Sequence, residues 1–211
     1  MMTPQDTYQC IAAYPGVTES CICDVRARCL QYKGCPNKSA SILLDFDGAA
    51  HTYQTEKNEP QTPQSVDAIA VDHAQQLLIL IEKKTWGQFL YYLPATEKAD
   101  PAGAALSKLS TYDLKGKYES TRKICEHITK EKDLFLYLPH VFVFLTELSD
   151  KDPMAGFASM LTSLAYTSST VDYTIQQPIV KGMKTHLSTV PCSKSRYLNC
   201  MELDSFIRHP Y

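Results

Sequence analysis

Residues 65–84, SVDAIAVDHAQQLLILIEKK, decide the expected fold, because they predict two strands joined by a short polar turn. Side chains alternate along a strand, so Glu82 and Lys84 are expected on the same face. With a turn centred on 74–75, Asp67 lies opposite Glu82 on that face, and their Cβ atoms are about 5 Å apart. Opposed carboxylates repel each other, and a divalent cation bound between them would remove the repulsion. The hairpin therefore predicts a metal site.

The composition is that of an ordinary globular protein. The chain has 211 residues, of which 44% are apolar and 21% charged, and this length fits a single domain over 1–211. The net charge of −2 gives no general attraction to nucleic acid. Binding of phosphates would therefore need a local basic patch or a metal ion.

The N-terminal stretch MMTPQDTYQC lacks the basic start and apolar core of a signal peptide. The longest apolar runs, such as 77–81, are much shorter than the ~20 residues that cross a bilayer. We expect a soluble, cytoplasmic protein with no membrane partner.

The pattern along the chain predicts an α/β fold with a central mixed β-sheet flanked by helices. The prolines of 48–64 favour a long loop, and the type of 86–93 stays undecided. The expected helices are 18–33, 106–130 and 154–166, the expected strands are 41–47, the two hairpin strands, 134–148, 173–180 and 197–201, and 99–104 is expected to be a loop.

Asp67, Glu82 and Lys84, in the run VDAIAVD…LLILIEKK, resemble the motif of the PD-(D/E)xK nuclease-like superfamily, over about 18–148. The resemblance implies a restriction-endonuclease-like α-β-β-β-α-β core, with 149–211 as a C-terminal elaboration. It also implies a Mg²⁺- or Mn²⁺-dependent nuclease that hydrolyses phosphodiester bonds of DNA or RNA. The chain departs from the motif at Val66, where the family's name-giving proline would stand.

The same resemblance suggests further site residues. Family members often carry an acid on the first helix, for which Glu19 is the candidate and Asp24 the alternative. A basic residue on the second core helix matches Lys117, with Lys115 and Ser120 nearby.

The chemistry suits these residues independently of the family. Asp67 and Glu82 offer the hard oxygen ligands that Mg²⁺ prefers. A bound metal would activate water and stabilise the charge of the transition state, while Lys84 positions that water or the phosphate.

The family also suggests a setting and an alternative. Small members often occur in bacterial defence or restriction systems, in which a targeting protein subunit supplies specificity. The alternative from another functional class is a catalytically inactive interaction protein with the nuclease fold.

Four of the eight cysteines are close together, as Cys21, Cys23, Cys29 and Cys35. Thiolates suit zinc and iron–sulfur clusters, but the spacing lacks paired CxxC knuckles. Buried, reduced thiols that act as small apolar side chains are the favoured interpretation.

The stretch 41–48, SILLDFDG, resembles the first motif of haloacid-dehalogenase-like phosphatases. In that interpretation Asp45 is the nucleophile and Asp47 the general acid, and Thr146 supplies the hydroxyl of the second motif. No later GDxxxD or paired aspartates complete a magnesium site, which makes this alternative the weaker one.

The aromatic side chains of 86–92, namely Trp86, Phe89, Tyr91 and Tyr92, are of the kind that stack on nucleobases. A place in the core or at a sheet edge is the favoured interpretation for them.

Overall fold

The computed structural model describes residues 2–25, 39, 41–74, 76–148 and 173–208. The strands are β1 (Thr18–Cys21), β2 (Ile42–Asp45), β3 (Ala68–Asp72), β4 (Leu77–Lys84), β5 (His140–Thr146) and β6 (Ser195–Asn199). The helices are α1 (Pro4–Ala12), α2 (Asp47–Lys57), α3 (Trp86–Tyr91), α4 (Pro101–Ser110), α5 (Leu114–Thr129), α6 (Leu134–Tyr137), α8 (Tyr173–Leu187), the short 3-10 helix η2 (Cys200–Glu202) and α9 (Leu203–Arg208).

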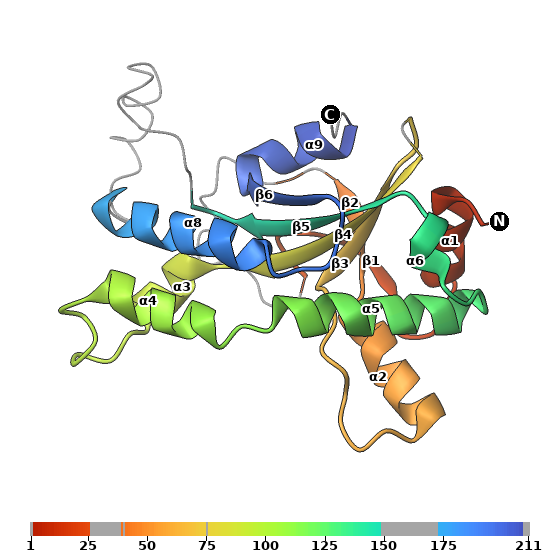
Figure 1. Ribbon diagram of the computed structural model, residues 1–211, viewed down its shortest axis with the longest axis horizontal. Coiled ribbons are helices and arrows are strands. Elements are labelled where there is room, and N and C mark those ends of the chain that lie inside the picture. The colour runs from red at the N-terminus through yellow and green to blue at the C-terminus, as the bar shows by residue number, and fades with distance from the viewer. Residues whose placement is uncertain (1, 26–38, 40, 75, 149–172, 209–211) are drawn as a thin grey trace.

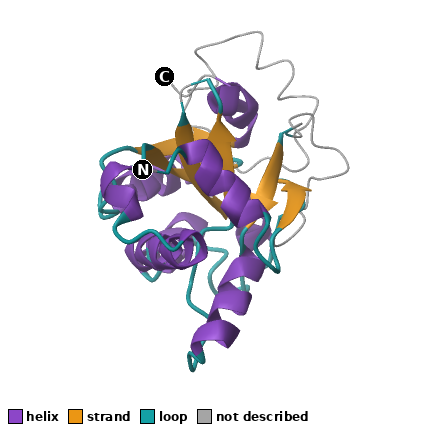
Figure 2. Ribbon diagram, turned by 90° about the vertical axis from the view of Figure 1, so that its right-hand side faces the viewer, coloured by secondary structure: helices purple, strands orange, loops and turns teal. Residues whose placement is uncertain are grey.

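The strands form one mixed sheet in the order β1-β2-β3-β4-β5-β6. From β1 to β4 each strand is antiparallel to the next, whereas β5 and β6 continue parallel to β4. Helices lie on both sides of the sheet, with α5 and α9 on opposite sides in Figure 1. In both ribbon views α2 projects away from the sheet (Figures 1 and 2). These features confirm the predicted α/β class and the central mixed sheet flanked by helices.

Two hydrophobic cores cover the two faces of the sheet. The larger core packs α1, α2, α5 and α8 against one face, through residues such as Leu80 and Phe142. The smaller core lies on the other face, where Ile81 and Val143 belong to the same cluster as Leu203 of α9. Leu80 and Ile81 are neighbours in β4 and belong to different cores, as the strand period of two requires. The continuous apolar run of β4 follows from burial of this central strand on both faces.

The expected helix over 18–33 is wrong at its start. Residues Thr18–Cys21 form β1 and pair antiparallel with Ile42–Asp45. Pairing with a neighbouring strand outweighs the partial helical periodicity, which rested on residues further along the chain. The remainder, 26–33, lies outside the described residues.

The expected loop over 48–64 is wrong for its first part, because Asp47–Lys57 form α2. The helix ends at Asn58, whose φ of 53° places it in the left-handed region that terminates helices. Pro60 and Pro63, which suggested a loop, lie beyond that end.

The expected loop at 99–104 and helix over 106–130 are instead two helices separated by 111–113. Pro101 begins α4, where a proline costs no hydrogen bond, and the Asp100 side chain accepts a bond from Gly103 N (2.9 Å). Asp113 caps α5 in the same way by accepting from Gly116 N (2.7 Å).

The secondary structure predicted for the C-terminal part of the chain is only partly confirmed. The strand region 134–148 contains a short helix, α6, before β5 begins at His140. The strand predicted over 173–180 is wrong, since these residues open helix α8. Ile179, Met183 and Leu187 are buried at intervals of four, which is a helical signal. The strand predicted near 197–201 is confirmed in part, because β6 covers Ser195–Asn199 whereas Cys200–Glu202 form η2. The predicted helix 154–166 lies outside the described residues.

The elements β2, β3, β4, α5 and β5 occur in the order expected of the nuclease-like core, but α2 lies between β2 and β3, α3 and α4 lie between β4 and α5, and α6 lies between α5 and β5. The α-β-β-β-α-β core itself stays a prediction, because much of the stretch before β2 is outside the described residues.

Candidate active site

The hairpin of β3 and β4 has the register that the sequence predicts. Ala68 pairs with Ile81, and Asp67 N donates to Ile81 O at 3.0 Å, which places the Asp67 side chain opposite that of Glu82. Both side chains are fully buried, at 0% exposure. Two carboxylates thus enter the protein interior at one end of the hairpin, on the face of the larger core.

The two carboxylates have different partners. Asp67 Oδ2 accepts a hydrogen bond from Lys83 N at 2.7 Å. Glu82 Oε1 accepts from Lys117 Nζ at 2.8 Å and from the Tyr112 hydroxyl. Glu82 Oε2 is buried and has no hydrogen-bond partner among the described residues. A buried carboxylate oxygen without a partner is costly, so this atom needs an explanation.

Electrostatics distinguishes Glu82 from ordinary surface acids. Burial and the nearby charge of Asp67 raise its pKa to about 8, against the smaller lowering effects of Lys117 and Tyr112. The ammonium of Lys117 therefore does not offset the combined effect of burial and the Asp67 charge on the ionised form of Glu82. A divalent cation would supply the missing positive charge.

Lys117, which the family resemblance suggested, reaches Glu82 from α5. It is only 4% exposed, and its ammonium also donates to Ser65 O at 3.3 Å. One turn further along α5, Thr121 Oγ1 accepts from Val66 N at 3.0 Å. These two contacts tie α5 to the backbone just before Asp67. The neighbour Lys115 instead lies on the exposed side and faces Glu119 at 3.9 Å.

Lys84 lies on the same face of β4 as Glu82 and is half-buried. Its ammonium is over the rings of Trp86, Phe89 and Tyr112, at 5.3, 5.7 and 5.5 Å from their centroids. The Lys117 ammonium lies 5.3 Å from the same Tyr112 ring. The structure therefore brings Glu82 and both lysines together around Tyr112.

Lys83 belongs to the opposite face of the sheet. Its ammonium donates to the carbonyls of Ile22 and Val25, both at 3.0 Å, and so holds the turn after β1. Its side chain has a structural role, whereas its backbone N–H orients Asp67.

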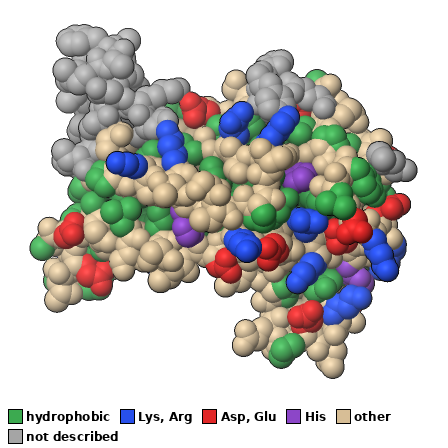
Figure 3. All heavy atoms as spheres, in the orientation of Figure 1, with side chains coloured by type: hydrophobic (Ala, Val, Ile, Leu, Met, Phe, Trp, Pro, Cys, Tyr) green, Lys and Arg blue, Asp and Glu red, His purple; other side chains and the backbone are tan. Residues whose placement is uncertain are grey.

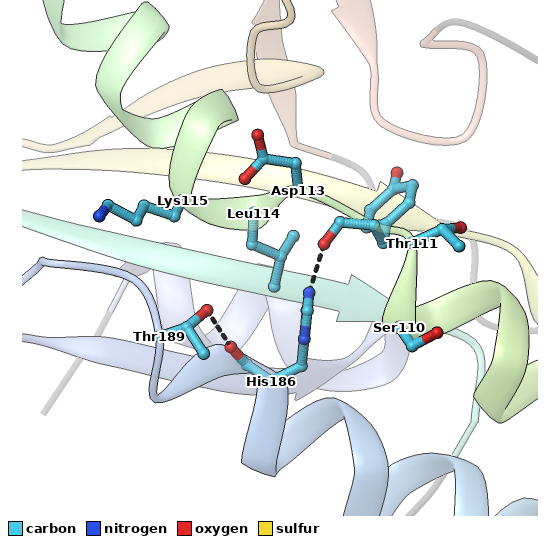
Figure 4. Close-up of a pocket in the computed structure, with 8 residues that line it drawn as sticks. Ser110, Thr111, Asp113, Leu114, Lys115, His186 and Thr189 are labelled. Carbon is cyan, nitrogen blue, oxygen red and sulfur yellow. Dashed lines mark hydrogen bonds between the residues drawn. The ribbon is translucent and has the colours of Figure 1, made fainter.

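Sequence reasoning missed Tyr112. It lies between α4 and α5, stacks on Phe144 at 6.1 Å between ring centroids, and bonds Glu82. Its carbonyl is bonded by the His186 ring of α8, beside a cavity of about 190 Å³ shown in Figure 4. The N-cap signal of Asp113 could have marked the helix break and so the loop that carries this tyrosine.

Glu19 is not brought to the site. It is exposed on β1, opposite Leu44 of β2, and one whole strand separates it from β3. The expectation of a helical acid here fails because this segment is a strand. The alternative, Asp24, lies in the turn that follows β1.

The predicted cysteine cluster is described only in part, because Cys29 and Cys35 lie outside the described residues. Cys21 donates to Ser39 O at 3.2 Å, and burial raises the pKa of its thiol. In the described part of the chain, three or more His, Cys, Asp or Glu side chains nowhere gather as a metal site. The zinc or iron–sulfur interpretation stays a prediction.

The phosphatase motif is separated in space. Asp45 ends β2, and its carboxylate accepts from Asp47 N at 3.2 Å. Thr146 ends β5, three strands away in the sheet order, which is roughly 14 Å at about 4.8 Å per strand. The two residues therefore do not form one site.

Comparison of the chain with protein-family models, with curated proteins and with solved structures finds no match. The resemblance to the PD-(D/E)xK nucleases thus rests on the residues themselves and stays a prediction. Through the ranges that the structure describes, no helix is long and apolar enough to cross a membrane.

Proposed function

We propose that this chain is a metal-dependent nuclease that hydrolyses phosphodiester bonds of DNA or RNA. The observation that carries the proposal is the buried Glu82 Oε2, which lies without a hydrogen-bond partner in a site that also holds the Asp67 carboxylate. Opposed buried acids are unfavourable in a purely structural role. Asp67 and Glu82 would hold Mg²⁺ or Mn²⁺, and their oxygen ligands fit those ions.

Other groups of the protein would position the two carboxylates and bind the phosphate. The Lys83 N–H fixes the Asp67 carboxylate, and Lys117 fixes that of Glu82. When bound, the metal would lower the pKa of a water molecule and neutralise charge on the phosphate. Lys84, two residues from Glu82 on the same face, would bind the phosphate through its ammonium.

Substrate access requires a local movement, because Asp67 and Glu82 are fully buried and Tyr112 bonds Glu82 directly. The half-buried Tyr112 side chain lies in a connection between two helices rather than inside one. Its displacement would release one hydrogen bond and expose the carboxylate.

The direct test combines metal binding with catalysis. Calorimetry with Mg²⁺ and Mn²⁺ should show saturable binding to the native chain and loss of it in Asp67→Asn and Glu82→Gln. Glu82→Gln keeps the shape of the side chain, so Lys117 retains a partner. Cleavage of labelled DNA and RNA should fall by about a hundredfold or more in both variants, since a catalytic metal contributes several kcal/mol.

Glu19→Gln is the matched control, because this acid is exposed on β1 and away from the site. It should bind metal and cleave as the native chain does. Equal metal binding by all the variants, or cleavage that survives both site substitutions, would contradict the proposal.

A second candidate function has one observation in its favour. The buried ion pair of Glu82 with Lys117 satisfies half of the carboxylate inside the protein, as expected of an inactive nuclease fold that serves as an interaction protein. Absence of both metal binding and cleavage in the native chain would favour this alternative.

A further inference from the structure

A cavity of about 450 Å³ opens beside Lys84, at the end of β4. Its wall continues through α3 and the segment that follows, and includes Gln88, Phe89, Tyr92 and Glu97. This volume falls within the range of about 300–1,000 Å³ that is usual for small-molecule sites.

The walls combine aromatic and polar groups. Phe89 and Tyr92 supply aromatic rings, and Tyr92 is 66% exposed, which is unusual for so large a side chain. Gln88 accepts from the Thr85 hydroxyl at 3.3 Å, and its amide can also bond the edge of a ligand. A flat ligand with apolar faces and a polar edge fits these walls.

Lys84 joins this cavity to the proposed active site. Its ammonium lies 5.7 Å from the ring of Phe89, in the cavity wall, and 5.5 Å from the ring of Tyr112, which bonds Glu82. If Lys84 holds a phosphate, the base of the same nucleotide can therefore reach the cavity.

The net charge and the face of the molecule in Figure 3 do not favour the binding of a long duplex backbone. The net charge is −2, and lysines and arginines are interspersed with acids on the face shown in Figure 3. Affinity for duplex DNA comes largely from neutralising many phosphates with basic side chains. Stacking of unpaired bases on aromatic rings needs fewer charges.

We propose that the cavity bounded by Phe89 and Tyr92 is a nucleobase subsite, and that the substrate is single-stranded nucleic acid. The inference rests on the proposed nuclease function and specifies its substrate. An unpaired base stacks on Tyr92 while Lys84 holds the adjoining phosphate.

Two adjacent tyrosines provide the test. Tyr91 and Tyr92 are both highly exposed, at 70% and 66%, but Tyr92 alone of the pair lines the cavity. Binding of fluorescein-labelled single-stranded oligothymidylate is measured by fluorescence anisotropy, with a chelator present to prevent cleavage. Tyr92→Ala should weaken binding about tenfold, as expected for one stacked base, while Tyr91→Ala and Tyr92→Phe stay within about twofold of the native chain.

A labelled duplex of the same length should bind at least about tenfold more weakly than the single strand, because its bases are already stacked and paired. Equal affinity for duplex and single strand, equal losses in the two alanine variants, or absence of single-strand binding would overturn the inference.

The nuclease function is tested separately, by measuring cleavage in Mg²⁺ with the native chain and with Glu82→Gln. Cleavage that needs Glu82, together with unchanged single-strand binding in Tyr92→Ala, overturns the subsite and leaves the nuclease. Binding that depends on Tyr92 without any cleavage supports the subsite and contradicts the nuclease.

Discussion

Burial and the charge of Asp67 raise the pKa of Glu82 to about 8, yet a carboxyl group binds a metal ion in its ionised form. Two requirements therefore compete at this residue. Without a cation the interior favours the protonated acid, and with one the carboxylate becomes favourable. Metal binding and protonation of Glu82 should be linked.

The first prediction is that metal binding releases a proton. Below about pH 8, binding of Mn²⁺ should release close to one proton, and affinity should rise by up to about tenfold per pH unit before it levels off. Calorimetry in two buffers with different ionisation enthalpies measures this release. Identical heats in both buffers at about pH 6 would contradict the linkage.

Substitution of Lys117 should lower the free energy of unfolding more than substitution of any other partner of Glu82. Lys117→Met removes the buried ammonium and leaves the acid without its ion pair, and we expect a loss of about 3 kcal/mol in the free energy of unfolding. The loss should grow with pH, because Glu82 can be neutral only while it holds its proton.

Lys115→Met is the control for that change, since Lys115 is exposed on the same helix and makes only a 3.9 Å surface pair. Its effect on urea denaturation should stay below about 0.5 kcal/mol. Equal effects of the two substitutions would show that the buried pair contributes little.

Among the secondary-structure elements, α5 does most to position the site. It places Lys117 beside Glu82, and Thr121 bonds the backbone of Val66 immediately before Asp67. The helix is thereby connected to the hairpin at Glu82 and at the residue before Asp67. A shift of α5 would move the lysine away from Glu82 and the backbone away from Thr121 together.

Thr121→Val tests this connection. The change leaves the buried Val66 N–H without its acceptor, and should cost about 1–3 kcal/mol of unfolding free energy as well as weaken metal binding. Thr185→Val in α8 is the matched control. Thr121 also donates its hydroxyl to the carbonyl four residues before it, Lys117 O at 2.8 Å. Thr185 makes the same bond to Lys181 O at 3.1 Å but is exposed. A similar loss in both variants would contradict the role of the Val66 contact.

For the molecule as a whole, buried titratable groups set opposite limits on the pH of greatest stability. Burial lowers the pKa of His140 below 6.5, so its contribution is complete above that value and is lost as pH falls. The pKa of Glu82 is raised from 4.5 to about 8, so its contribution is complete below 4.5 and is lost as pH rises towards 8. The raised pKa of the half-buried Glu147 acts in the same direction as that of Glu82.

Unfolding free energy measured in the absence of metal should therefore fall as pH rises above about 5, and above about pH 6.5, where His140 no longer opposes the acids, Glu82 alone should contribute a decline of up to about 1.4 kcal/mol per pH unit. Glu82→Gln should reduce that alkaline decline, and Glu97→Gln, which changes an exposed acid, should leave it as it is. A profile that is flat from about pH 6 to 8 in the native chain would contradict the buried, raised acid.

The sequence alone determined the β3–β4 hairpin and what it carries. The apolar run of β4 and the polar turn fix a register in which Asp67 faces Glu82, because a slip of one residue would turn every buried side chain to the other face. The α/β class followed from the same patterns, and Lys117 was named through the family resemblance.

Only the tertiary structure decided the rest of the site. Thr18–Cys21 became a strand through pairing with β2, which separated Glu19 from the acids. Tyr112 lies in a connection without periodicity, and its contact with Glu82 joins residues 30 positions apart. The contacts of Lys84 with aromatic rings likewise depend on how α3 and the α4–α5 connection pack against β4. Such contacts depend on long-range packing, which local sequence patterns do not encode.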